Sequence, residues 1–306
     1  AHLVLWGTPA DAAWAQAEIE RLEARWSRFL PDSDVTRCNR ASGHGPVEVA
    51  PETVDLVAAA IAWWHRTDGR FDPTVLHALE ALGYDAPFAE VRARRVDRPV
   101  VRSAPPGHPE LRIPAVSTAP DLRPAPGCAG IVVDRAAATI ALPAGVGLDL
   151  GGIGKGAAAD RVADGLRARG VTSACIGMGG DIRAFGPGNG PAGQGWAITV
   201  DDPLDPSRAW FTHVIDDAAV VTSTDRIRRW ERAGRAVHHL VDPTTGSSAR
   251  TGLAAVVVAA PSCADAEVLA KAAFVAGPDA GRALCDRFGV ETWFAADTPT
   301  AVGSPT

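Results

Sequence analysis

The sequence predicts an α+β fold built on a mixed β-sheet with flanking helices. Strand-like segments follow one another directly in some parts of the chain and are separated by helix-like segments in others, which favours a mixed sheet over a purely parallel one. The composition is typical of a globular protein, with 46% hydrophobic and 22% charged residues in a chain of 306. We expect residues 1–306 to form a single domain.

The N-terminal part of the chain predicts a strand followed by three helices. A strand-like run at 3–6 precedes a pattern in which apolar residues recur every three or four positions as far as Phe29. This helix should end near Leu30, because a residue that precedes proline avoids helical angles. Further helices are expected at 52–66, where a proline occupies the first turn, and at 72–82.

The segment at about 87–126 interrupts this regular pattern. It is rich in arginine and then in proline, which predicts a surface excursion with little regular structure. The tail at 297–306 is also expected to be loose. The excursion is therefore a candidate for shaping substrate entry or a partner contact.

The C-terminal part alternates strands with three helices. A hairpin is expected from 131–134 and 139–142, and a helix at 157–169 follows a glycine-rich turn. Helices are also expected at 264–276 and 279–288. The remaining strands are predicted at 174–178, 196–200, 219–222, 237–241, 253–260 and 290–295.

Charge and cysteine content exclude several classes of function. The formal net charge of −6 argues against nucleic acid as the main partner, and no apolar run reaches the roughly 18 residues of a membrane span. The five cysteines form no CxxC pair, which argues against a zinc site, and their odd number favours free thiols in a reducing compartment. We therefore expect a cytoplasmic protein. The alternative is the cell envelope, by export or lipid anchoring, if an N-terminal signal has been removed.

The most informative motif is the glycine-rich run Asp149-Leu-Gly-Gly-Ile-Gly-Lys155-Gly. It lies between a strand-like and a helix-like segment, where free N–H groups and the positive end of the helix dipole suit a phosphate. Lys155 adds a mobile charge and Asp149 a carboxylate for a metal or a hydroxyl group. The alternative is a turn that serves tight packing only.

Several further motifs follow one another in a specific order. Together with the glycine-rich run they resemble the ApbE family of bacterial flavin transferases (FAD:protein FMN transferases), from about Trp26 to Pro278. The motifs are Phe71-Asp72-Pro-Thr, Leu82-Gly83-Tyr84, Met178-Gly-Gly-Asp181, Ser223-Thr-Asp225 and His238-His239-Leu-Val-Asp242-Pro-Thr-Thr-Gly246.

This resemblance implies an ApbE-like fold and a flavin transfer reaction. Such a protein binds FAD, transfers FMN through a phosphoester bond to a Ser or Thr of an acceptor flavoprotein, and releases AMP. Two alternatives stay open: an FAD pyrophosphatase that forms FMN and AMP, and a non-catalytic FAD-binding or carrier protein with a degenerate metal site. A dinucleotide-dependent dehydrogenase is disfavoured because the glycine-rich turn lacks GxGxxG spacing.

The resemblance also implies which residues form the site. His239 is the candidate base, since imidazole titrates near neutrality, and His238 beside it should point to the opposite face of its strand. The implied cofactor-binding residues are Phe29, Leu82, Gly83, Tyr84, Asp149, Lys155, Gly180, Asp181, Ser223, Thr224, Asp225 and His239.

One position departs from the family pattern. The family's magnesium ligands are an Asp and a Thr four residues apart, where this chain has Glu267 and Lys271. In one interpretation the Lys271 ammonium replaces part of the charge of the metal ion at the diphosphate of FAD, which makes Lys271 and Glu267 catalytic candidates. In a second, Mg²⁺ still binds through Glu267 and the carbonyl groups of Gly152 and Ala270. In a third, Glu267 and Lys271 form an ordinary helix-surface ion pair.

Overall fold

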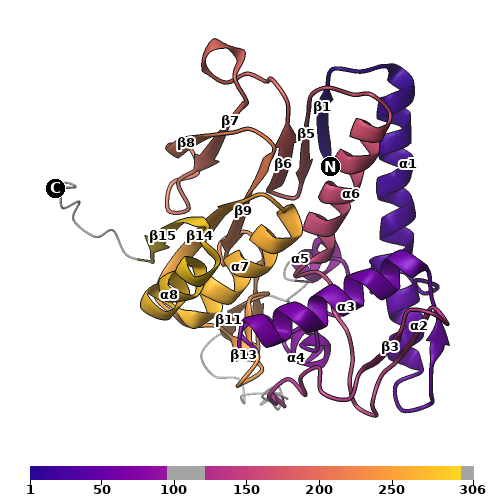
Figure 1. Cartoon of the computed structure of the whole chain (residues 1–306). Coiled ribbons are helices and arrows are strands. Elements are labelled where there is room, and N and C mark those ends of the chain that lie inside the picture. Colours follow the sequence, from indigo (N-terminus) through magenta and orange to yellow (C-terminus); the bar gives the residue numbers. More distant parts are fainter. Residues whose placement is uncertain (95–120, 298–306) are drawn as a thin grey trace, which may run out of the picture.

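The computed structural model describes residues 1–94 and 121–297. Most of the predicted excursion, and the tail from residue 298, lie outside the described residues. The α+β class predicted from the sequence is confirmed, with helices packed on a central sheet (Figure 1). Within the described ranges, each helix is too short or too polar to cross a membrane.

The central sheet has six strands in the order β1-β5-β6-β9-β14-β15. All of its neighbouring strands are antiparallel, so the prediction of a mixed sheet was wrong in this respect. The connection from β14 to β15 contains two helices. A single crossover helix would make the two strands parallel, whereas the second helix reverses the chain once more and makes them antiparallel. The strands are His2–Leu5 (β1), Ala174–Met178 (β5), Asp181–Phe185 (β6), Ala218–Thr224 (β9), Leu253–Ala260 (β14) and Glu291–Ala296 (β15).

Helices cover one face of this sheet and a two-stranded hairpin covers the other. Helix α6 packs on β5 and β6, and α7 packs on β9 and β14, with α1 beside α6 and α8 beside α7 (Figure 1). The opposite face carries the β7–β8 hairpin, whose apolar side chains pack on β9 and β14. These elements are Pro9–Trp26 (α1), Gly154–Ala168 (α6), Cys263–Ala276 (α7), Pro278–Phe288 (α8), Trp196–Asp201 (β7) and Ala209–Ile215 (β8).

The sequence of strand β14 is apolar throughout because both faces of the strand are buried. Val256 and Val258 belong to the core under the helices, whereas Val257 and Ala259 belong to the core under the β7–β8 hairpin. Since successive side chains point to opposite faces, burial of both faces requires an unbroken apolar run. This strand was predicted with the bounds that the structure has.

The smaller elements surround one end of the sheet. Helix α3 and the β3–β4 hairpin agree with the prediction, whereas α2, α5, β2, β6, β8, β10 and β13 were not predicted. Helix α5 lies at the start of the excursion at 87–126, where little regular structure was expected. The bounds are Asp34–Arg40 (α2), Pro51–Arg66 (α3), Leu76–Ala81 (α4), Phe88–Ala93 (α5), Val47–Glu48 (β2), Val132–Asp134 (β3), Thr139–Ala141 (β4), Arg229–Arg232 (β10), Arg235–His238 (β11), Val241–Asp242 (β12) and Ser247–Ser248 (β13).

Three predicted elements have different limits in the structure. Helix α1 ends at Trp26 because Ser27 takes an extended conformation, so Phe29 lies in the following turn and not on the helix. The helix expected at 72–82 begins only at Leu76, after Asp72 has accepted hydrogen bonds from Thr74. The strand expected at 237–241 divides into β11 and β12, with His239 in the bend between them.

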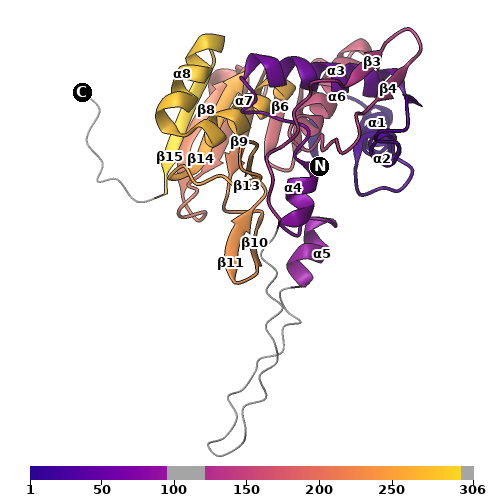
Figure 2. The same ribbon diagram turned by 90° about the horizontal axis from the view of Figure 1, so that it is seen from below.

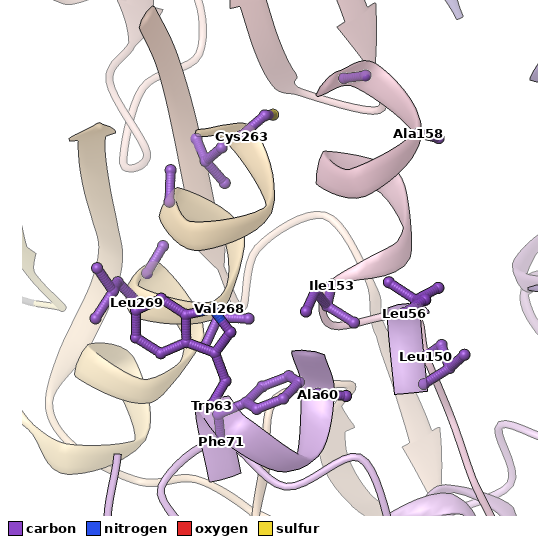
Figure 3. Close-up of a cluster of buried hydrophobic side chains, with 14 of the residues drawn as sticks. Leu56, Ala60, Trp63, Phe71, Leu150, Ile153, Ala158, Cys263, Val268 and Leu269 are labelled. Atoms are coloured by element: carbon purple, nitrogen blue, oxygen red, sulfur yellow. The ribbon is translucent and has the colours of Figure 1, made fainter. Parts of the chain in front are cut away.

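A buried apolar cluster holds the glycine-rich turn in place. Figure 3 shows Trp63 and Phe71 close to Ile153, which precedes α6, and to Val268 and Leu269 of α7. A Cβ atom at position 152 would lie only 2.8 Å from the ring of Phe71, so only glycine fits there. Packing therefore explains part of the glycine content of this turn.

Candidate functional site

A cavity of about 430 Å³ lies where α1, α4, the glycine-rich turn and α7 meet. Its wall combines an apolar and aromatic part with a cationic part, a composition typical of ligand sites. Seven of the residues predicted from the sequence line it: Phe29, Tyr84, Asp149, Gly152, Lys155, His239 and Lys271.

The carboxylate of Glu267 lies behind the cavity-lining Lys155 and Lys271 and has no solvent exposure. Its Oε1 accepts hydrogen bonds from the ammonium groups of Lys155 and Lys271, the latter at 2.9 Å. Its Oε2 accepts the backbone N–H of Gly156 at 2.8 Å. Lys155 also contacts Asp181 at 2.7 Å. Two half-buried lysines and two buried carboxylates thus form one compact cluster.

Helices α6 and α7 cap one another through this region. Asp160 of α6 accepts the backbone N–H groups of Cys263 and Ala264 at the start of α7. In return, Glu267 of α7 accepts the N–H of Gly156 at the start of α6, where the helix dipole favours a negative charge. One of the N–H groups that the sequence suggested for a phosphate is therefore taken by a carboxylate of the protein.

The charges in the cluster shift one another's pKa values. Burial alone would raise the pKa of Glu267, but Lys155 and Lys271 outweigh it and lower that pKa to about 2. Burial alone would lower the pKa of Lys155, but Glu267 and Asp181 raise it above the usual 10.5. Burial lowers the pKa of Lys271, with Glu267 opposing the shift, and burial raises the pKa of Asp181 against the effect of Lys155.

These contacts do not fit a magnesium site. Both oxygens of Glu267 are engaged by protein donors, and the Lys271 ammonium, a donor without a lone pair, stands where the family has a ligand. Ala270 is fully buried and does not line the cavity. In the described part of the chain, no group of three or more His, Cys, Asp or Glu residues is arranged to hold a metal ion.

The aromatic part of the cavity is built around Arg28. Its guanidinium lies 4.2 Å from the ring centroid of Phe29 and 4.9 Å from that of Tyr84, and its Nε lies 2.6 Å from Asp149. The two rings are 5.8 Å apart in a tilted arrangement. Arg28 thus ties the carboxylate of the glycine-rich turn to both aromatic residues.

The two adjacent histidines face different surroundings, as the sequence predicted. His239 lines the cavity, whereas His238 is buried against Phe274 and its Nε2 lies 3.0 Å from the carbonyl oxygen of Ala249. Burial lowers the pKa of His239 well below 6.5, and the nearby charges of Arg228 and Lys271 add to this effect. His239 is therefore neutral at neutral pH and able to accept a proton.

The remaining predicted residues do not line the cavity. Leu82 is in the core, and Gly83 faces Arg232 and Trp230. Asp181 lies behind Lys155, while Gly179 and not Gly180 reaches the cavity wall. The group Ser223, Thr224 and Asp225 lies at the end of β9, where Thr224 donates to the carbonyl of Ala254 and Asp225 pairs with Arg226 and Arg229.

Three cavity-lining arginines were not predicted from the sequence: Arg28, Arg70 and Arg228. Arg70 and Arg228 have no ion-pair partner within residues 1–94 and 121–297. Both stand next to quoted motifs, Arg70 before Phe71-Asp72 and Arg228 after Ser223-Thr-Asp225. Their positions next to these motifs could have indicated that they belong to the site. Arginine by itself does not indicate a binding site, because it is frequent on protein surfaces.

Comparison with known proteins relates the chain to one family. The chain matches the profile described as "ApbE family" over residues 2–294. It is 30% identical to the FAD:protein FMN transferase of Treponema pallidum, covering 90% of this chain and 74% of that protein, and 28% identical to that of Vibrio cholerae, covering 90% and 78%.

Solved structures give the same result. The apo form of the flavinyl transferase ApbE from Pseudomonas stutzeri has a TM-score of 0.73 at 28% identity, covering 95% of this chain and 84% of that one. The ApbE protein of Thermotoga maritima has a TM-score of 0.75 at 27% identity, covering 96% and 89%. The chain therefore belongs to the ApbE family.

Proposed function

We propose that this protein is an FAD:protein FMN transferase that links FMN to a Ser or Thr hydroxyl of an acceptor flavoprotein. The observation that carries the proposal is that one cavity is lined by aromatic rings, by cationic groups and by a neutral histidine. The named activity of the relatives supports it.

The cavity suggests how FAD would lie. The flavin ring would pack against Phe29 and Tyr84, while the diphosphate would face Lys155, Lys271 and Arg228. Lys271 uses one donor on Glu267 and is 17% exposed, and Lys155 is 28% exposed, so both keep N–H donors for phosphate oxygens. Arg228 and Arg70, which also line the cavity, would add further positive charge.

The reaction would proceed by attack of the acceptor hydroxyl oxygen on the FMN phosphorus. The O–H proton passes to the neutral ring of His239, the new P–O bond forms, and the bond from that phosphorus to the bridging oxygen breaks. AMP leaves with the bridging oxygen, and the cations stabilise its developing negative charge.

We further propose that Lys271 supplies the charge that a metal ion would otherwise bring. Glu267 would serve to hold the two lysines at the cavity floor. Its complete burial makes the interpretation as a helix-surface ion pair wrong. The cytoplasmic location expected from the five free cysteines stays a prediction.

The experiment that tests the function measures AMP release and acceptor labelling together. FAD would be incubated with and without an acceptor flavoprotein domain that the Vibrio cholerae relative labels, in Mg²⁺ and in EDTA. Acceptor-dependent AMP release, with flavin fluorescence that survives denaturing electrophoresis, is the expected result. AMP release without labelling would instead identify a pyrophosphatase. Bound FAD without AMP release would identify a carrier, the alternative that the departure from the family's metal ligands at Glu267 and Lys271 favours.

Replacing Lys271 by threonine tests the charge-replacement proposal. We expect the wild-type rate of AMP release to be equal in Mg²⁺ and EDTA within about twofold. The Lys271→Thr variant should lose activity in EDTA by about 10²-fold, the lower end of the effect of removing one donor that stabilises transition-state charge, and regain part of it with Mg²⁺. Equal rates of the variant with and without chelator would contradict the proposal.

Replacing Arg228 by glutamine tests the placement of the diphosphate. We expect FAD to bind about tenfold more weakly, or about 1.4 kcal/mol, because a charged hydrogen bond is lost. Riboflavin has no phosphate, so its dissociation constant should stay the same in titrations of flavin fluorescence. Equal weakening for both ligands would show that Arg228 acts on cavity shape. Lys155 is a poorer probe because it also neutralises Glu267 and Asp181.

A further inference from the structure

The β10–β11 hairpin is strongly basic in a chain that is acidic as a whole. Between Asp225 and Arg235 there are five arginines and two acidic residues, a net of three positive charges, whereas the whole chain carries −6. Ile227, just before the hairpin, is 74% exposed. This segment therefore presents positive charge together with an exposed apolar side chain.

Among the described residues, the two arginines at the hairpin tip differ from those at its base. Arg226 pairs with Asp225 and Asp297, and Arg229 pairs with Asp225, but Arg232 and Arg235 form no ion pair within the described residues. These two residues lie directly opposite each other on the paired strands and are both exposed. Like charges directly opposite each other in a sheet are unfavourable, so an anionic partner would be stabilising here.

The hairpin is firmly held at the mouth of the cavity. Arg228, which precedes it, and His239, which follows it, both line the cavity. On its inner face Trp230 donates its indole N–H to the Leu82 carbonyl at 2.8 Å and packs with Val237 against α4. Figure 2 shows the hairpin extending from the body of the protein on the same side as α4 and α5.

We propose that the β10–β11 hairpin is the docking surface for the acceptor protein, and that the acceptor presents acidic side chains beside its Ser or Thr. This inference rests on the proposed transferase function. A protein that brings a hydroxyl group to His239 passes this hairpin, where its carboxylates meet the guanidinium groups of Arg232 and Arg235. The exposed Ile227 adds an apolar contact at the base of the hairpin.

The test reverses the charge at the tip in the double variant Arg232→Glu/Arg235→Glu. The initial rate of labelling would be measured against the concentration of an acceptor domain that the Vibrio cholerae relative labels, together with FAD affinity. We expect the KM for the acceptor to rise about tenfold while kcat and the dissociation constant of FAD stay within about twofold. The neutral variant Arg232→Gln/Arg235→Gln should give an intermediate KM.

A control with the same change of net charge is Arg208→Glu/Arg135→Glu, at two exposed arginines away from the hairpin, of which Arg135 pairs with the exposed Asp55. Its KM should equal that of the wild type. The wild-type KM should also rise between 50 and 300 mM NaCl, since salt screens exposed charges over about 10 Å, and the hairpin variant should lose most of this dependence.

Three outcomes overturn the inference in distinguishable ways. If the wild type labels the acceptor and the hairpin variant has an unchanged KM, docking lies elsewhere while the transferase function stands. If the wild type labels no acceptor that the Vibrio cholerae relative labels, the proposed function fails and the inference fails with it. If KM is unchanged but the wild type, and not the variant, sediments with anionic phosphatidylserine vesicles, the hairpin recognises a lipid surface instead.

Discussion

Replacing Glu267 by glutamine should lower the free energy of unfolding by about 3–5 kcal/mol, the typical cost of breaking a buried ion pair from one side. The change leaves the Lys271 ammonium without the carboxylate that it contacts at 2.9 Å, and leaves Lys155 with Asp181 only. Urea unfolding would measure the loss as a lower midpoint at an unchanged slope.

Two further variants show whether this loss comes from uncompensated charge. Glu267→Gln/Lys271→Met removes both partners of the contact and should recover part of the stability, because no unpaired ammonium stays buried there. Glu18→Gln removes the carboxylate of a helix-surface pair with Arg21 and should cost less than about 1 kcal/mol. If Glu267→Gln costs no more than Glu18→Gln, the cluster contributes little to stability.

The same cluster predicts a pH dependence with a definite sign. The pKa of Glu267 is about 2 in the folded protein against a usual 4.5, so the folded state binds fewer protons at this group than the unfolded chain. Its contribution to stability is therefore complete above pH 4.5 and is lost as the pH falls towards 2. The stability difference between wild type and Glu267→Gln should shrink over that range.

Replacing His239 by asparagine should slow acceptor labelling by about 10²–10⁴-fold, the usual contribution of a general base. The binding of FAD should change little, since an asparagine keeps a polar side chain of similar reach at the cavity wall. Labelling rates at saturating acceptor, together with FAD titrations, would separate the two effects. A variant that keeps more than about a tenth of the wild-type rate would exclude His239 as the base.

The pKa of His239 adds a second readout for this role. Because burial and neighbouring cations hold that pKa well below 6.5, the wild-type rate should stay level as the pH falls from 8 to 6.5 and decline only at lower pH. His77→Asn is a suitable control, since His77 is exposed on α4 and pairs with Glu80. Its rate and pH profile should match those of the wild type.

Local sequence patterns predicted most of the regular elements. The unbroken apolar run of β14, the apolar spacing of α3 and α7, and the apolar strands of the β3–β4 hairpin depend on residues close together in the chain. Errors occurred where contacts from distant segments decided the outcome. Helix α1 ends before Phe29, where Arg28 turns towards Asp149, more than a hundred residues away in the sequence.

The sequence by itself determined the α+β class, the family resemblance and seven of the residues that line the cavity, because motifs and apolar periodicity are local properties of the chain. Only the tertiary structure decided the burial and the contacts of Glu267 and Lys271. Their spacing of four residues is equally typical of an exposed helix pair, and the difference comes from Lys155, which reaches Glu267 across 112 positions of sequence. Burial and charge compensation depend on such long-range packing, which no local pattern encodes.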